Sequence, residues 1–153
     1  MSNYKGHLVG GIVSFLLVIS LLRSSFNPTL VTAIEWLFFT LAGALFPDID
    51  TKSVGQKIFF RLIFVMFSYL IIVNKLELIP FLSLIAIVPL LVNHRGLFHK
   101  LWFIILIPVA VSLYFKYFIP KYFLIMAFNS VFFISGAISH ILLDFGFKGL
   151  IRR

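Results

Sequence analysis

The chain alternates between long hydrophobic runs and short polar breaks. Six runs with few charged residues occupy residues 7–23, 29–46, 57–74, 77–92, 100–118 and 121–144. A helix needs about 20 apolar residues to cross the hydrocarbon core of a bilayer, and the runs approach that length. Strands of a membrane barrel would alternate apolar and polar residues, and these runs do not. The pattern therefore predicts an all-α fold, a polytopic membrane helical bundle of about six transmembrane helices that forms a single domain over residues 1–153.

The composition supports a membrane protein, and it alters how the net positive charge of the chain is interpreted. Of the 153 residues, 61% are hydrophobic and 12% are charged, whereas soluble domains are about half apolar and a quarter charged. The net charge of +8 comes from lysines and arginines that flank the hydrophobic runs. It therefore predicts contact with anionic membrane lipid and not with nucleic acid. The absence of cysteine excludes disulfide bonds and thiolate metal ligands.

The aspartates and histidines gather in four short clusters. The clusters are His7, Asp48 with Asp50, His94 with His99, and His140 with Asp144. Membrane chains avoid such residues because burying them is costly, and those that remain are usually functional. Imidazole and carboxylate groups together are typical ligands of zinc, manganese and iron. The clusters therefore predict a metal site.

Counting spans from the N-terminus places all four clusters at the same face of the membrane. That face also holds nine lysines and arginines, against four at the other face. Cytoplasmic segments carry an excess of positive residues. The sequence therefore predicts a multi-pass protein of the cell inner (plasma) membrane with both termini in the cytoplasm and the clusters on the cytoplasmic side.

Spacing within each cluster favours metal binding. His140 and Asp144 are four residues apart and share one face of a helix. Asp48 and Asp50 follow Pro47, and in a non-helical turn both carboxylates can reach one cation or bridge two. His94 and His99 can meet if the chain folds tightly at Gly96. His7, at the start of the first run, can complete the ligand set.

Seven candidate ligands exceed the three or four of a single catalytic zinc. We therefore expect two or more divalent ions, with zinc first and manganese or iron as alternatives. Paired ions about 3.5–4 Å apart can activate water and stabilise the leaving oxygen of a phosphoester. Arg95, between the two histidines of its cluster, has the planar fork that suits a phosphate.

Two further features lie inside the hydrophobic runs. Glu35 is a carboxylate within the second run, and Arg23 is the simplest partner for it. Gly43-Ala44 and Gly136-Ala137 lie about one turn before Asp48 and His140. Small residues at these positions predict that the second and sixth helices approach each other closely.

In the order and form of its motifs the chain resembles the YdjM-type family of membrane-bound, metal-dependent hydrolases. The motifs are Gly6-His7, Pro47-Asp48-Ile49-Asp50, His94-Arg95-Gly96-Leu97-Phe98-His99, and His140 with Asp144. That family pattern usually reads His-Arg-Gly-x-Thr-His-Ser, and this chain has Phe98 and Lys100 in place of the threonine and the serine. The family is similar to zinc-dependent phospholipase C and the single-strand nucleases, and that resemblance implies phosphoester hydrolysis.

These observations together predict a membrane-embedded metal-dependent hydrolase that acts on a phosphoester of a lipid or headgroup. The predicted catalytic residues are Asp48, Asp50, His94, Arg95, His99, His140 and Asp144. The predicted metal ligands are His7, Asp48, Asp50, His94, His99, His140 and Asp144. Two alternatives remain open. One is a transporter or channel for a divalent metal or protons, whose site would lie near the middle of the membrane. The other is a non-enzymatic membrane module with a structural metal.

Overall fold

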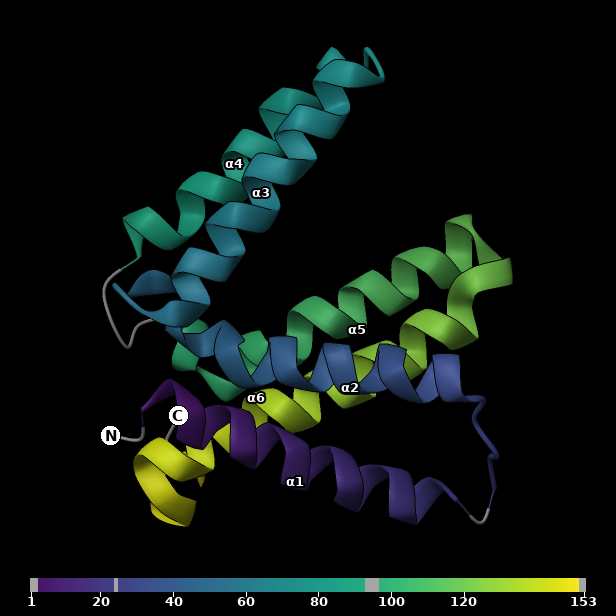
Figure 1. Ribbon diagram of the computed structural model, residues 1–153, viewed down its shortest axis with the longest axis vertical. Coiled ribbons are helices and arrows are strands. Elements are labelled where there is room, and N and C mark those ends of the chain that lie inside the picture. The colour runs from purple at the N-terminus through teal and green to yellow at the C-terminus, as the bar shows by residue number, and fades with distance from the viewer. Residues whose placement is uncertain (1–2, 24, 93–96, 152–153) are drawn as a thin grey trace.

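The computed structural model describes residues 3–23, 25–92 and 97–151, and the side chains up to residue 146. In these residues, six α-helices and four short 3-10 helices follow one another along the chain (Figure 1). The α-helices are α1 (Tyr4–Leu22), α2 (Leu30–Leu45), α3 (Val54–Ile72), α4 (Ile79–Leu91), α5 (Leu101–Phe118) and α6 (Phe123–Ile151). The 3-10 helices are η1 (Phe46–Asp50), η2 (Leu76–Leu78), η3 (Leu97–His99) and η4 (Pro120–Tyr122). The predicted all-α fold with six helices is confirmed.

Within the described residues, five helical segments are long and apolar enough to cross a membrane. They are Tyr4–Leu22, Leu30–Asp50, Val54–Ile72, Leu101–Phe118 and Pro120–Gly146. The fourth run is shorter than we expected, because α4 has 13 residues and its helix is therefore about 20 Å long. Large apolar side chains such as Leu21, Leu30 and Ile72 cover the outside of the molecule. The hydrophobic exterior identifies a multi-pass membrane protein.

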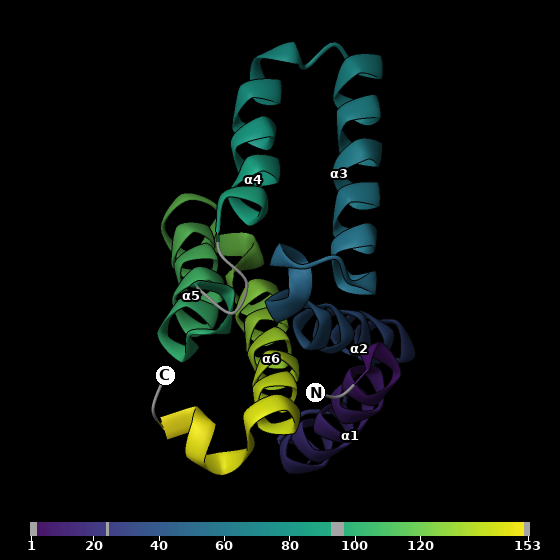
Figure 2. The same ribbon diagram turned by 90° about the vertical axis from the view of Figure 1, so that its left-hand side faces the viewer.

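Helices α1, α2, α5 and α6 form a bundle in which α6 contacts each of the other three. Helices α3 and α4 form a hairpin that leaves the bundle at an angle (Figures 1 and 2). Ile104, Ala137 and Ile141 are fully buried where α5 meets α6. On the other side of α6, Trp36 of α2 stacks on Phe128 and Phe132, with ring centroids 5.3 and 4.7 Å apart.

Helices α2 and α6 approach each other closely at two glycines. A Cβ atom added to Gly43 would overlap the Phe133 carbonyl oxygen, and one added to Gly136 would overlap the Thr40 carbonyl oxygen. The two backbones therefore touch without side chains between them. The predicted close approach of the second and sixth helices is present, and it brings the end of α2 beside His140.

The start of α1, η1, η3 and the end of α6 lie together at one end of the bundle (Figure 1). These segments carry every described histidine and aspartate, namely His7, Asp48, Asp50, His99, His140 and Asp144. A polar site can therefore form at that end, while the opposite end of the bundle is left to the α1–α2 and α5–α6 connections.

Candidate metal centre

Asp48 is positioned by a turn of 3-10 helix at the end of α2. Pro47 is the second residue of that turn, where proline is tolerated because the first positions of a helix need no backbone donor. The Asp48 carbonyl oxygen accepts hydrogen bonds from the hydroxyls of Thr51 and Ser53, at 3.0 and 2.8 Å. Ser53 also caps α3 by accepting a hydrogen bond from the Gln56 backbone at 3.0 Å. The backbone of Asp48 is thereby held against the start of α3.

The prediction of a non-helical turn around Asp48 and Asp50 was wrong. Both residues lie in η1, where successive side chains point about 120° apart because the helix has three residues per turn. Residues two apart therefore diverge. Asp48 belongs to a group of possible metal ligands, whereas Asp50 lies outside both groups that the described residues form.

His140 is oriented by the end of α2. The last four carbonyl groups of a helix lack partners within that helix, and Ala44 lies in the last turn of α2. Its carbonyl oxygen is 2.7 Å from Nδ1 of His140. Since a carbonyl oxygen only accepts, Nδ1 carries the proton, and Nε2 is left with its lone pair. This is the usual arrangement of a metal-binding histidine.

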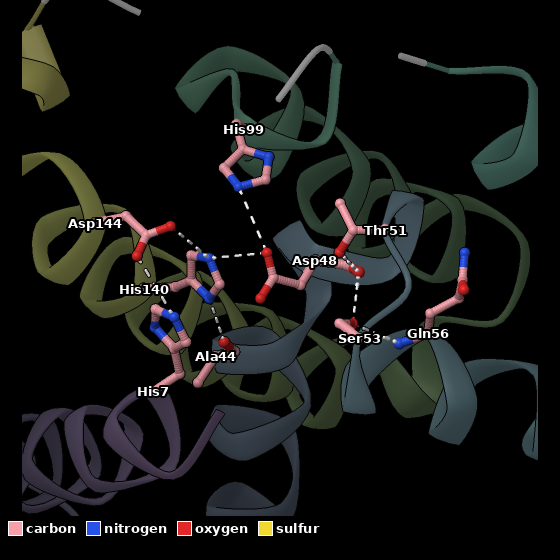
Figure 3. Close-up of polar contacts among 9 residues, drawn as sticks. All are labelled: His7, Ala44, Asp48, Thr51, Ser53, Gln56, His99, His140 and Asp144. Carbon is pink, nitrogen blue, oxygen red and sulfur yellow. Dashed lines mark hydrogen bonds and ion pairs between the residues drawn. The ribbon is translucent and has the colours of Figure 1, made fainter. Parts of the chain in front are cut away.

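Three histidines from three different elements are buried at this end of the bundle (Figure 3). His7 comes from α1, His99 from η3 and His140 from α6, and none is more than 1% exposed. Asp48 and Asp144 point toward them (Figure 3), with side chains that are 18% and 1% exposed. A buried carboxylate is costly unless a positive charge or hydrogen bonds compensate it.

Nitrogen and carboxylate oxygen atoms in the cluster are spaced as metal ligands are. His140 Nε2 lies 3.6 Å from Asp48 Oδ1 and 3.7 Å from Asp144 Oδ2. His99 Nε2 lies 3.8 Å from the same Asp48 oxygen, and His7 Nε2 lies 3.6 Å from Asp144 Oδ1. These distances exceed those of hydrogen bonds. Ligand atoms about 2.1 Å from a tetrahedral ion lie roughly 3.4 Å apart, so a small cation fits between them.

The ligand atoms form two groups that share His140. One group is Asp48, His99 and His140, and the other is His7, His140 and Asp144; the atoms of each group lie within 4.8 Å of one another. The free lone pair of His140 Nε2 can bind one ion, so the two groups cannot use it for two ions at once. The donor set of imidazole and carboxylate fits a divalent transition metal.

Ring orientation separates the two groups. The rings of His99 and His140 are inclined by 69°, with centroids 5.6 Å apart. The rings of His7 and His140 are stacked, with centroids 3.8 Å apart and planes inclined by 13°. A nitrogen lone pair lies in the plane of its ring, so stacked rings do not converge on one ion. His99 and His140 can therefore share an ion as they stand, whereas His7 would have to rotate.

Two predicted site residues lie outside the described residues, namely His94 and Arg95. Phe98, at the position of the threonine in the family pattern, is 3% exposed. It packs edge-to-face on Phe46 and Phe103, with centroids 5.4 Å away in each case. Position 98 therefore serves the apolar packing around η3.

The expected pairing of Glu35 with Arg23 was wrong. The carboxylate of Glu35 accepts a hydrogen bond of 2.6 Å from the side-chain amide of Asn129 on α6, while Arg23 is exposed at the end of α1. Sequence reasoning also missed Ser53 and the Ala44 carbonyl. Ser53 followed by Gln56 three residues later is the sequence pattern of a helix N-cap, so the role of Ser53 could have been predicted. A backbone carbonyl leaves no such signal.

Comparison with known proteins supports the assignment to a membrane family. A sequence model described as YdjM inner membrane protein matches residues 1–149. No match was found among curated proteins or among solved structures. The matched range includes every segment that contributes to the metal centre, from His7 on α1 to Asp144 on α6. The chain therefore belongs to the YdjM inner membrane protein family.

Proposed function

We propose that the protein is a membrane-embedded, metal-dependent hydrolase that cleaves a phosphoester of a membrane lipid or its headgroup. One observation carries this proposal: Asp48 lies 3.8 Å from His99 and 3.6 Å from His140, and Asp144 lies 3.7 Å from His140, at one end of the bundle. Buried histidines and carboxylates at ligand spacing fit catalysis better than packing.

The first ion would be held by Asp48, His99 and His140. Two histidines and one carboxylate are a ligand set of catalytic zinc, which keeps one position open for substrate. Ala44 would fix the orientation of His140, and an Asp144 carboxylate oxygen lies 3.7 Å from Nε2 of the same histidine. Zinc is the first candidate, with manganese or iron as alternatives.

A second ion would need ligands besides His140. His7 and Asp144 form one possible half-site, since His7 Nε2 lies 3.6 Å from Asp144 Oδ1. His94 and Asp50 are the remaining candidates by sequence. The group of Asp48, His99 and His140 supplies three ligands for one ion, and metal analysis decides whether one or two ions bind.

The metal would lower the pKa of a bound water and polarise the phosphoester. The protein would contribute orientation and exclusion of water. The histidines are buried, so their electrostatic effect on the substrate is screened little by solvent. Arg95 would clamp the phosphate oxygens, as its position between His94 and His99 predicts. On the positive-inside count this face is cytoplasmic, with both termini on the same side.

Elemental analysis of the purified protein in detergent tests the metal site directly. We expect at least one transition-metal ion per chain, and its loss in His140→Asn, a variant that retains a donor for the Ala44 carbonyl but removes the ligand nitrogen. The control is Glu77→Gln, which removes an exposed carboxylate paired with Lys75 at 3.8 Å and should keep the metal. A well-folded wild-type protein without metal would refute the proposal.

Hydrolysis of a panel of phospholipids then separates the proposed enzyme from its rivals. The hydrolase loses turnover in His140→Asn while keeping its fold. A protein with a structural metal instead loses thermal stability in that variant and hydrolyses none of the lipids. A transporter moves metal across liposomes, and the position of the ligands at one end of the bundle argues against it.

A further inference from the structure

An apolar groove runs along the outside of the bundle between α1 and α6. Its volume is about 600 Å³, within the range of about 300–1,000 Å³ of ligand sites. Val9, Val13 and Leu17 of α1 line one side, and Leu142 and Leu143 of α6 line the other. Both helices are among the candidate membrane spans, so the groove opens to lipid.

Small residues form the floor of the groove. Gly6, Gly10 and Ser14 of α1 are four residues apart, so they lie on one face of the helix, opposite Ser135 and Ser139 of α6. Because these side chains are small, the two helices meet at the floor and leave a channel between the larger side chains on either side. The residues that line the groove extend from Gly6 to Leu17 of α1, about 16 Å along the helix, so a hydrocarbon chain can lie lengthwise in it.

The hydroxyl groups in the floor are already used. Ser14 donates to the Ser135 carbonyl oxygen at 3.0 Å, while Ser135 donates to Phe132 at 2.8 Å and Ser139 to Gly136 at 2.7 Å. No hydroxyl hydrogen in the groove is left to recognise a polar ligand. The groove therefore selects an apolar occupant.

One end of the groove adjoins the metal centre. Gly6, Ser139 and Leu143 line the groove, and each is followed directly in the chain by a candidate ligand, His7, His140 or Asp144. Lys5, exposed beside this end, can attract a phosphate. A molecule with an apolar tail and an anionic head would therefore place its head at the metal and its tail between α1 and α6.

We propose that this groove holds an acyl chain of the phospholipid whose headgroup ester the metal centre cleaves. The inference rests on the proposed function and names its substrate as a lipid bound by its tail. The groove makes α1 a substrate-binding helix, in addition to its role in carrying His7. Binding of the chain in the groove would fix the depth at which the phosphoester meets the ligands.

Photolabelling tests this without depending on turnover. Wild-type protein in phosphatidylcholine nanodiscs is irradiated with a phosphatidic acid that carries a diazirine in its acyl chain. We expect labels on residues 9–17 and 135–143. Val13→Trp fills the groove, and labelling there should fall roughly tenfold, since exclusion of two methylene groups changes binding by about that factor. Ile12→Trp is the control, because Ile12 is similarly exposed but does not line the groove.

The outcomes distinguish the groove from the enzyme. Labels that spread evenly over the outer faces of α3 and α5 would overturn the proposal that the groove binds an acyl chain. Labelling of the groove that is unchanged in Val13→Trp would overturn it as well. Labelling of the groove in a protein that hydrolyses none of the lipids would support acyl-chain binding and refute the proposed hydrolase activity. Metal content of Val13→Trp equal to that of Ile12→Trp shows that the variant is folded, and Val9→Trp serves as a second groove-filling variant if it is not.

Discussion

Gly136→Ala probes whether the close contact of α2 and α6 builds the metal centre. The added Cβ would overlap the Thr40 carbonyl oxygen, and it would lie 2.8 Å from the Thr40 carbonyl carbon and 3.0 Å from the Ala44 nitrogen. Carbon atoms pack at about 3.5–4.0 Å. All these atoms belong to the backbone, so no side chain can rotate away, and the helices must separate by about 1 Å.

The separation acts directly on His140. Its Nδ1 lies 2.7 Å from the Ala44 carbonyl oxygen, and a shift of about 1 Å takes this pair beyond the limit of a good hydrogen bond. Loss of the partner that orients a metal-binding histidine lowers metal affinity about 10–100-fold. Overpacking in addition costs about 1–3 kcal/mol of stability.

Competition for zinc against a chromophoric chelator measures the affinity, and thermal unfolding in detergent measures the stability. Gly10→Ala is the matched control, because its Cβ would come too close only to the flexible end of Leu143, at 2.6 Å from Cδ1, and would meet Ser139 Oγ at an ordinary contact distance of 3.6 Å. Both variants exchange glycine for alanine within a helix, so the gain in helix propensity of about 1 kcal/mol is common to them. Equal zinc affinity in Gly136→Ala, Gly10→Ala and wild type would refute the reasoning.

Two further predictions concern the buried polar groups. Asn129→Leu removes the donor to Glu35 and should lower the stability in detergent by about 0.5–2 kcal/mol; Glu35→Gln keeps an acceptor oxygen and should cost less, so equal losses in thermal unfolding would contradict the assignment. Removal of metal with a chelator should lower the melting temperature of wild type and Glu77→Gln but not of His140→Asn, because a ligand at about a hundredfold excess over Kd contributes about 2.7 kcal/mol. Melting that is unaffected by the chelator in wild type would count against the metal centre.

Much of the architecture follows from the sequence because the bilayer constrains it. A helix that crosses the hydrocarbon core must satisfy its own backbone groups and present apolar side chains, so the length and spacing of the runs predict the helices. The same period places His140 and Asp144 on one face of α6. Paired small residues at Gly43 and Gly136 predict close approach, since only small side chains let two membrane helices touch. Each of these inferences rests on a pattern within one short segment of the chain, such as an apolar run or a pair of small residues.

What the sequence by itself determined is therefore the set of helices and the clustering of the described histidines and aspartates at one end of the bundle. Only the tertiary structure decided which residues the buried polar side chains contact. Asn129 meets Glu35 across 94 positions of the chain, and Ala44 meets His140 across 96. Both contacts depend on how α2 is rotated and shifted against α6. The physical reason is that a repeating pattern indicates which face of a helix is apolar, whereas rotation and shift are set by packing along the whole contact.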